Sequence, residues 1–299
     1  MIQAPASRRP LLWGTAMALG AALGGQGLMA APAASDARPV AVSGYTYVER
    51  ASATNSTPSR SVRASCPRGK VILAGGARIV DGGNRVLLRG SYPVRSHRGH
   101  GWAVSAEELG ALNSARWSVR AYAVCANRPL GLQYRTVSSG SDSKSPKSPS
   151  SAVCPRGTRL IGLGASVAGV NHPIGINAIT VTSSRSASVR ASEALATSLR
   201  WRVRTHIVCA ELGQTYQETD WKTVPSPAQA GTALAVCPRG TKAFGAGVRV
   251  SAIEAAFNRL VPVEVRPTLA PSGARTTVSE LASGMLSHWH LKAQVICVR

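Results

Sequence analysis

The chain has 299 residues, which is more than one hydrophobic core usually serves, so two or three structural units are expected. Its hydrophobic content of 44% is too high for a disordered chain. There are 35 Lys and Arg against 13 Asp and Glu, a formal net charge of +22. The few acids argue against catalysis by a pair of carboxylates on composition alone, and the positive charge predicts attraction to polyanions.

The first 34 residues have the organisation of a secretory signal. Arg8 and Arg9 precede a mildly apolar run, Leu11–Gly24, and small residues follow at 30–34, where cleavage is expected. We predict a signal peptide over residues 1–34 for the general secretory (Sec) route, with the twin-arginine route as the alternative because of the pattern at Ser7–Leu12. No later stretch is long and apolar enough for a transmembrane segment, so the sequence predicts a secreted, extracellular protein.

The remainder of the chain repeats itself three times. The sequence Cys-Pro-Arg-Gly begins at Cys66, Cys154 and Cys237, and a Gly follows each of these Cys residues by ten positions. A Tyr precedes each motif, at Tyr47, Tyr134 and Tyr216. Each copy closes with a Trp and a Cys eight residues apart: Trp117–Cys125, Trp201–Cys209 and Trp289–Cys297. This periodicity predicts three homologous β repeats, which we place at 40–127, 128–211 and 212–299.

The Trp-to-Cys segments alternate as half-buried strands do. In the second copy, apolar residues from Trp201 to Cys209 share one face, and Arg200, Arg202, Arg204 and His206 share the other. Further strands are expected in the first repeat at Val71–Val80, Arg85–Val94 and Trp102–Ala106. No segment shows helical periodicity. The sequence therefore predicts an all-β protein of three tandem units, sandwich-like or prism-like, with pseudo-threefold symmetry.

Six cysteines in an exported chain predict three disulfides rather than metal ligands. Pairing within each repeat gives Cys66–Cys125, Cys154–Cys209 and Cys237–Cys297. A chained alternative gives Cys125–Cys154, Cys209–Cys237 and Cys66–Cys297. We favour the first because it treats every copy alike. The recurring glycines are interpreted as places where another backbone approaches closely, with a bare strand open to a sugar ring or a partner chain as the alternative.

This combination of C-P-x-G, a Gly-rich strand and W-x7-C resembles repeats in secreted proteins of high-GC actinobacteria, most of which are uncharacterised. The resemblance covers nearly the whole chain after the signal. It implies an extracellular, β-rich protein and transfers no functional residue. The chain differs from the pattern in having Arg68, Arg156 and Arg239 at the third motif position, where small residues are commoner, and these add to its positive charge.

No catalytic constellation is recognisable. All six cysteines are assigned to disulfides, there is no Gly-x-Ser-x-Gly, and the six histidines occupy non-equivalent positions in the repeats. His288 and His290 form an H-x-H that two imidazoles could use for zinc, but their counterparts in the other repeats are ordinary solvent-face residues, so no metal and no cofactor is predicted. The closest acid clusters are expected in solvated loops: Glu107–Glu108 and Glu218/Asp220.

The remaining signal is charge on the outer faces of the Trp-to-Cys strands. The candidate binding residues are Arg116, Arg120, Arg200, Arg202, Arg204, His288, His290 and Lys292. They predict a non-catalytic binding module for an anionic glycan or another polyanion, with three copies supplying avidity. The alternative is a structural or inhibitory secreted protein that acts through protein contacts, with Ser138–Ser151 as a mobile recognition loop inside the second repeat. Base-specific nucleic-acid recognition is not expected, because no recognition helix accompanies the charge.

Overall fold

The structure, a computed structural model, describes residues 41–97, 99–110, 116–149, 151–225, 230–252, 258–281 and 287–299. The predicted signal peptide, residues 1–34, lies outside the described residues. Residues 39–299 form one compact unit, and every regular element described in it is a β-strand, as predicted. No helix of membrane-spanning length and hydrophobicity occurs in the part of the chain that the structure describes.

The strands follow the three repeats. Repeat 1 supplies β1 (Thr46–Ala51), β2 (Ser59–Ser65), β3 (Val71–Val80), β4 (Val86–Ser96), β5 (Gly99–Glu108) and β6 (Ser118–Ala126). Repeat 2 supplies β7 (Gln133–Ser138), β8 (Ala152–Val153), β9 (Arg159–Ala168), β10 (Ile174–Ser183), β11 (Ser186–Glu193) and β12 (Arg202–Ala210). Repeat 3 supplies β13 (Gln214–Glu218), β14 (Lys222–Val224), β15 (Ala230–Val236), β16 (Lys242–Ser251), β17 (Leu260–Leu269), β18 (Ser272–Glu280) and β19 (Trp289–Val298).

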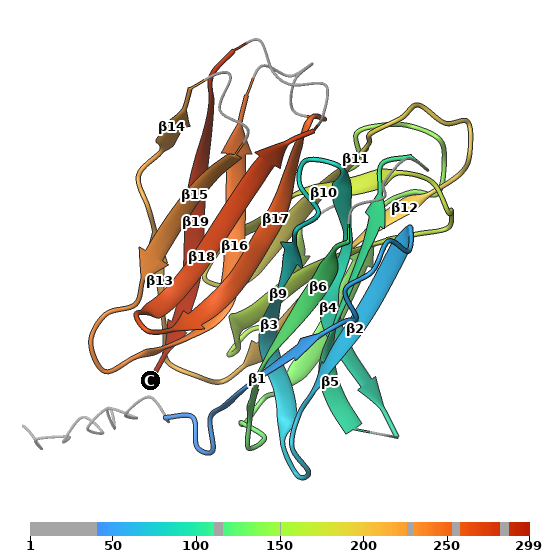
Figure 1. Cartoon of the computed structure of the whole chain (residues 1–299). Helices are drawn as coiled ribbons and strands as arrows, with labels where there is room; N and C mark the ends of the chain where they lie inside the picture. The colour runs from blue at the N-terminus through green and yellow to red at the C-terminus, as the bar shows by residue number, and fades with distance from the viewer. Residues whose placement is uncertain are drawn as a thin grey trace, which may run out of the picture. The chain divides into compact units, whose positions relative to one another are not determined.

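Each of the three sheets combines strands from two repeats (Figure 1). Sheet 1/3 has the order β1-β6-β3-β17-β18-β15, sheet 1/2 has β2-β5-β4-β9-β12-β7, and sheet 2/3 has β13-β19-β16-β10-β11-β8 with β14 paired to β19. Every repeat thus gives one half-sheet to each of two sheets. The three repeats form one body with shared sheets rather than a row of separate units, and the exact cuts between them stay predictions.

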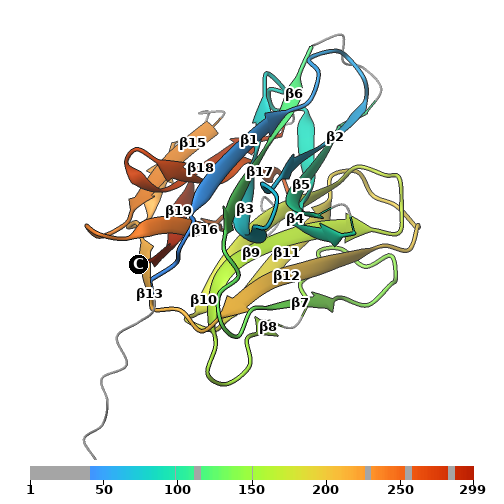
Figure 2. The ribbon, with the colours of Figure 1, turned by 90° about the horizontal axis from the view of Figure 1, so that it is seen from below.

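The two halves of each sheet meet along a seam of antiparallel pairing, β3 with β17, β4 with β9, and β10 with β16 (Figure 2). The recurring glycines lie at these seams. A Cβ on Gly76 would stand 2.4 Å from the carbonyl oxygen of Val265, and one on Gly164 would stand 2.2 Å from that of Ser91. Because real side chains do not tolerate such distances, the interpretation as sites of close backbone approach is confirmed.

The glycine strands β3, β9 and β16 also contact one another where the three repeats converge. Each carries a register shift soon after its start, and the fully buried side chains of Leu73, Ile161 and Phe244 lie at these irregularities. Phe244 of repeat 3 belongs to the same hydrophobic cluster as the cores of repeats 1 and 2. The core is therefore continuous between repeats, which accounts for a single compact unit with few aromatic residues.

The disulfides pair within each repeat: Cys66–Cys125, Cys154–Cys209 and Cys237–Cys297, with a Cα–Cα distance of 5.7 Å in all three. The favoured pairing is confirmed and the chained alternative is wrong. Cys66 follows β2 in sheet 1/2, whereas Cys125 lies in β6 in sheet 1/3. Each bridge thus joins two different sheets, and three disulfides are consistent with an extracellular location.

Each repeat also buries the Trp that begins its Trp-to-Cys strand. The side chains of Trp117, Trp201 and Trp289 are 0% exposed. The Nε1 atom of each donates a hydrogen bond to a carboxylate at the end of a strand: Glu108 at 2.6 Å, Glu193 at 2.7 Å and Glu280 at 2.7 Å. The placement of Glu107 and Glu108 in a solvated loop was wrong, because both belong to β5. Glu108 ends β5 and is 4% exposed, because the buried indole N–H requires an acceptor.

In two repeats a cation covers the indole. The guanidinium of Arg60 lies 4.7 Å from the Trp117 ring centroid, and Nζ of Lys147 lies 4.7 Å from that of Trp201. Gly231 has the equivalent strand position in repeat 3, because it pairs with the residue two before Glu280. Lys147 belongs to the segment expected to be a mobile loop between β7 and β8. Its buried side chain, bound to Asp142, anchors that segment beside Trp201.

Candidate functional site

The predicted basic residues lie along three strands that belong to three different sheets. Arg116 and Arg120 lie on or beside β6 in sheet 1/3, and Arg200, Arg202 and Arg204 on or beside β12 in sheet 1/2. The third set, on or beside β19 in sheet 2/3, is His288, His290 and Lys292. The fold brings the members of each set together and keeps the three sets apart, so they do not make one continuous patch.

Carboxylates neutralise two of these sets in part. Arg120 forms an ion pair of 2.6 Å with Glu49 on β1, and Lys292 forms one of 2.9 Å with Glu218 on β13. Glu218 also lies 3.9 Å from Arg249 of β16. The three repeats therefore differ in the charge that they present, although their strands are equivalent.

The set on β12 has no such partner. The guanidinium of Arg200 donates from Nε and Nη2 to the carbonyl oxygen of Ser141, at 3.0 and 2.8 Å. Among the described residues no carboxylate pairs with Arg202 or Arg204. Arg204 has Ser166 and Ser138 as its cross-strand neighbours, and both are too small to cover it. The side chains of Arg202 and Arg204 are thus half-buried, and no carboxylate of the described residues neutralises their guanidinium groups.

Glu218 is the acid that most changes the outer face of sheet 2/3. It was expected in a solvated loop, but it belongs to β13 and accepts hydrogen bonds from Tyr216, Lys292 and Gln294. Burial alone would raise the pKa of Glu218, but these three hydrogen bonds lower it to about 2. The group is therefore ionised at neutral pH and offsets the positive charge of this sheet.

The residue five positions after Trp117, Trp201 and Trp289 lies at a seam between repeats. The sequence places His206 on the outer face of β12, and the structure half-buries it there, whereas its two counterparts are fully buried. Tyr122 is 2% exposed and Gln294 is 0% exposed. Each lies opposite a seam glycine, Tyr122 facing Gly76 and Gln294 facing Gly247, with His206 facing Gly164. Because glycine has no side chain, the large side chain crosses it and contacts the neighbouring repeat: Tyr122 meets Arg266, His206 stacks on Tyr92, and Gln294 accepts from the Val181 amide.

His206 is consequently held neutral. Its Nε2 lies 2.9 Å from Oγ of Ser166 and its Nδ1 lies 3.1 Å from Oγ1 of Thr136. Burial lowers the pKa of His206 to about 4, and the positive charge of Arg204 acts in the same direction. His206 therefore adds no charge to the face at neutral pH.

The H-x-H motif places its two rings close together. The ring centroids of His288 and His290 are 5.6 Å apart, and Nδ1 of His290 lies 3.1 Å from Oγ1 of Thr223. Within the ranges that the structure describes, no group of three or more His, Cys, Asp or Glu is arranged to hold a metal ion. A zinc interpretation therefore has two imidazoles and no further ligand of these types.

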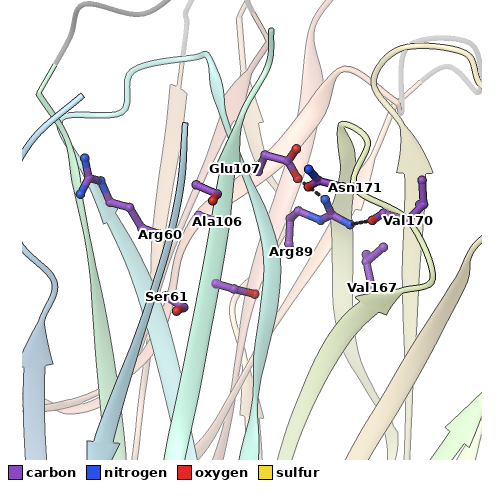
Figure 3. Close-up of a pocket in the computed structure, with 10 residues that line it drawn as sticks. Arg60, Ser61, Arg89, Ala106, Glu107, Val167, Val170 and Asn171 are labelled. Atoms are coloured by element: carbon purple, nitrogen blue, oxygen red, sulfur yellow. Dashed lines mark hydrogen bonds and ion pairs between the residues drawn. The ribbon is translucent and has the colours of Figure 1, made fainter. Parts of the chain in front are cut away.

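A polar cleft of about 360 Å³ opens on sheet 1/2 beside its seam (Figure 3). Arg89 crosses it, bound to Glu107 on β5 and to the carbonyl oxygen of Val170 at 2.7 Å. Arg60 points away from the cleft (Figure 3). The walls include Ser59, Ser61, Ser105 and Asn171.

The cleft offers hydrogen bonds but no recognisable catalysis. Arg89 and Glu107 neutralise each other, and among the described residues no base contacts Ser59, Ser61 or Ser105, as a nucleophilic serine would need. The three seams also differ in the residue at this position. Arg89 lies at a register shift whose counterparts are Asn177 in β10 and Val263 in β17, so the charge is specific to repeat 1.

Comparison with models of protein families gives no match for this chain, and comparison with curated proteins gives none either. What the protein does must therefore be inferred from its own residues. The features that distinguish one repeat from another carry the most information, because equivalent residues that all three share serve the common fold. Among the predicted residues, Arg202 and Arg204 of β12 are such a feature, because no carboxylate in the described part of the chain pairs with them.

Proposed function

We propose that the protein is a secreted, non-catalytic binding module that contacts an anionic polymer, such as an acidic glycan of a cell surface, through the outer face of β12. The observation that carries this proposal is the contrast between equivalent strands. Arg202 and Arg204 have no carboxylate partner among the described residues, whereas Arg120 and Lys292 are paired with Glu49 and Glu218. Export by the Sec route is part of the proposal, supported by the pattern of residues 1–34 and by the three disulfides.

The geometry of β12 suits an extended polyanion. Residues two apart on a strand share a face at a spacing of about 7 Å, so Arg202 and Arg204 lie on one face of β12, and Arg200 lies just before them. A guanidinium binds carboxylate and phosphate through two parallel hydrogen bonds. The net charge of +22 adds a long-range attraction that salt weakens.

The test is the salt dependence of retention on a heparin column. The variant R200S/R202S/R204S is expected to elute at lower salt than the wild type, and its plot of log affinity against log salt should lose a slope of about 2 to 3. The matched control R116S/R120S/K292S loses the same three charges from the other two sheets and should stay closer to the wild type. Equal losses in both variants would show that retention follows net charge alone and would refute the β12 face.

A second function, protein binding, is favoured by one observation. Leu234 and Val236 on β15, at the edge of sheet 1/3, are 37% and 49% exposed, and nearby Leu269 is 57% exposed. An exposed apolar edge strand can pair with a strand of another protein. A partner that remains bound at 1 M salt would favour this function, because polyanion contacts weaken there (the Debye length is about 3 Å). Loss of that partner in L234K would assign it to β15.

A further inference from the structure

A second and larger cleft lies within repeat 1, between its Cys-Pro-Arg-Gly turn and the β4–β5 turn. Its volume is about 590 Å³. Four of its lining side chains carry or can accept a positive charge, namely Arg68, Lys70, His97 and His100. The other lining residues are glycines, Cys66, Pro67 and Val71, and no acid is among them.

Further arginines surround this cleft. Nη2 of Arg63 donates to the carbonyl oxygen of Gly99 at 2.7 Å, and the guanidinium of Arg95 lies 4.3 Å from the Tyr134 ring centroid. His100 is tilted against the same ring, and its Nδ1 lies 3.4 Å from the Tyr134 hydroxyl. Burial lowers the pKa of His100 first, and Arg95, Arg128 and Arg63 lower it further. The charges around His100 are therefore positive, with no carboxylate among them.

The charged side chains in the cleft differ in whether they have hydrogen-bond partners within the protein. Lys70 has two, because its Nζ donates to the carbonyl oxygen of Gly44 at 2.6 Å and to Thr46. Arg68 and His97 are exposed at the rim, and no described residue forms a hydrogen bond or ion pair with either side chain. Arg68, His97 and His100 thus face a space that holds excess positive charge and no protein anion.

The site is specific to repeat 1. The Cys66 amide donates to the carbonyl oxygen of His100, the Cys154 amide to that of Arg185, and the Cys237 amide to that of Ser272, so these three acceptors are equivalent. In repeat 2 the Arg185 guanidinium turns back to the carbonyl oxygen of Cys154 at 2.6 Å. A feature that the fold itself required would recur in all three copies, and the histidine pair does not.

We propose that the cleft between the Cys-Pro-Arg-Gly turn of repeat 1 and the β4–β5 turn binds an oxyanion of the phosphate or sulfate type through Arg68, His97 and His100. Phosphate and sulfate offer several oxygen acceptors to guanidinium and imidazolium donors, and each such charged hydrogen bond gains strength from the absence of a competing carboxylate. This proposal rests on the proposed function only in taking the anion to be a group on a polymer. The binding site itself does not depend on β12.

Binding should be coupled to protonation. The partly buried His100, with positive charges around it, favours its neutral form when the cleft is empty, and an arriving dianion favours the imidazolium. Affinity for sulfate, which stays a dianion throughout this range, should therefore rise as the pH falls from 8 to 6, where histidine titrates. Arg63, Arg95 and Arg128 remain charged throughout this range, and the Tyr134 hydroxyl remains neutral, because burial raises its pKa to about 12.

The experiment is a titration of the full-length, oxidised protein with inorganic phosphate, followed by the imidazole NMR resonances at constant ionic strength. The resonances of His97 and His100 should shift and saturate, while those of His172, His288 and His290 should not. The variant H97N/H100N should bind phosphate at least tenfold more weakly, because two hydrogen bonds to a charged group are lost. H288N/H290N is the matched control and should bind like the wild type.

Uniform, non-saturating shifts of all histidines, or unchanged affinity in a folded H97N/H100N, would overturn the proposal. R68S, an exposed turn variant, should also weaken binding, while R156S at the equivalent turn of repeat 2 should not. A phosphodiester polymer and a sulfated glycan, compared at equal charge, identify the source of the anion. Failure of the β12 face would be seen separately, because R200S/R202S/R204S changes column retention and leaves phosphate affinity in this cleft unaltered.

Discussion

The carbonyl oxygen of Ser91 lies 2.2 Å from the position that a β-carbon on Gly164 would occupy. Ser91 belongs to β4 of repeat 1 and Gly164 to β9 of repeat 2, so the contact crosses the seam of sheet 1/2. Gly76 stands in the same relation to Val265 of repeat 3. The union of two half-sheets in one sheet thus depends on a missing side chain.

Gly164→Ala is therefore expected to destabilise the protein. The added methyl meets backbone rather than a flexible side chain, so the seam must open, at a cost of about 1–3 kcal/mol in the free energy of unfolding. The control is Gly140→Ala, whose β-carbon would have Asp142 Oδ2 at 3.3 Å as its nearest neighbour and which should change stability by less than about 0.5 kcal/mol. Urea unfolding of the oxidised protein measures both. Equal stabilities would show that the seam tolerates a side chain.

The hydrogen bond between Trp117 and Glu108 makes a second prediction. Glu108→Ala leaves the indole N–H of Trp117 without its acceptor and the buried guanidinium of Arg60 without a nearby negative charge. The free energy of unfolding should therefore fall by about 3 kcal/mol. Glu108→Gln retains an acceptor oxygen and should cost less. Asp220→Ala, an exposed acid, is the control and should be close to neutral. A ranking in which Gln costs as much as Ala would contradict the acceptor role.

Periodicity along the chain was enough to predict the all-β class, the Trp-to-Cys strands and the cysteine partners, because these depend on local alternation and on spacing. Alternation does not determine which strand lies next to which, so sharing of sheets between repeats was not predictable from it. The β4–β9 seam rests on two residue pairs, at Gly90 and Ser91. The order of charged residues along the chain also does not determine which residues pair across strands, so the ion pair between Arg120 and Glu49 could not be predicted.

One missed signal was present in the sequence. An acid precedes Trp117, Trp201 and Trp289 by eight or nine residues, at Glu108, Glu193 and Glu280, and this recurrence among only 13 acids pointed to a structural role. The covering residues vary together as well. In repeats 1 and 2 the cation over the Trp has a polar partner, Asn55 for Arg60 and Asp142 for Lys147. In repeat 3 the equivalent positions are Gly231 and Val224, so an apolar side chain takes the place of the cation and its partner.

The disulfide between Cys154 and Cys209 should contribute stability through the unfolded chain. It closes a loop with a sequence separation of 55, and in the chain-entropy model such a loop stabilises the folded state by about 4 kcal/mol. The variant C154A/C209A should therefore unfold at a markedly lower urea concentration, with the other two bridges intact on a non-reducing peptide map. A loss below about 1 kcal/mol would mean that the unfolded chain is already compact in this region.

The burial of His206 predicts acid sensitivity with a defined pH range. The pKa of His206 is lowered to about 4 in the folded protein, while the ordinary value of histidine is 6.5. Above about pH 6.5 neither state holds the proton, so this group has no effect on stability there. Between about pH 6.5 and 4 the unfolded chain takes up a proton that the folded protein refuses, and the free energy of unfolding falls by about 1.4 kcal/mol per pH unit.

His206→Gln should remove this slope. Gln294 occupies the equivalent position of repeat 3, so glutamine fits opposite a seam glycine and can replace the hydrogen bonds to Ser166 and Thr136. The exposed His288→Gln should keep the slope of the wild type. Because all three proteins share their other titrating groups, the difference between their unfolding curves at pH 7 and pH 5 isolates His206. If H206Q loses as much stability as the wild type on acidification, His206 takes up its proton in the folded state, and the seam is open to water.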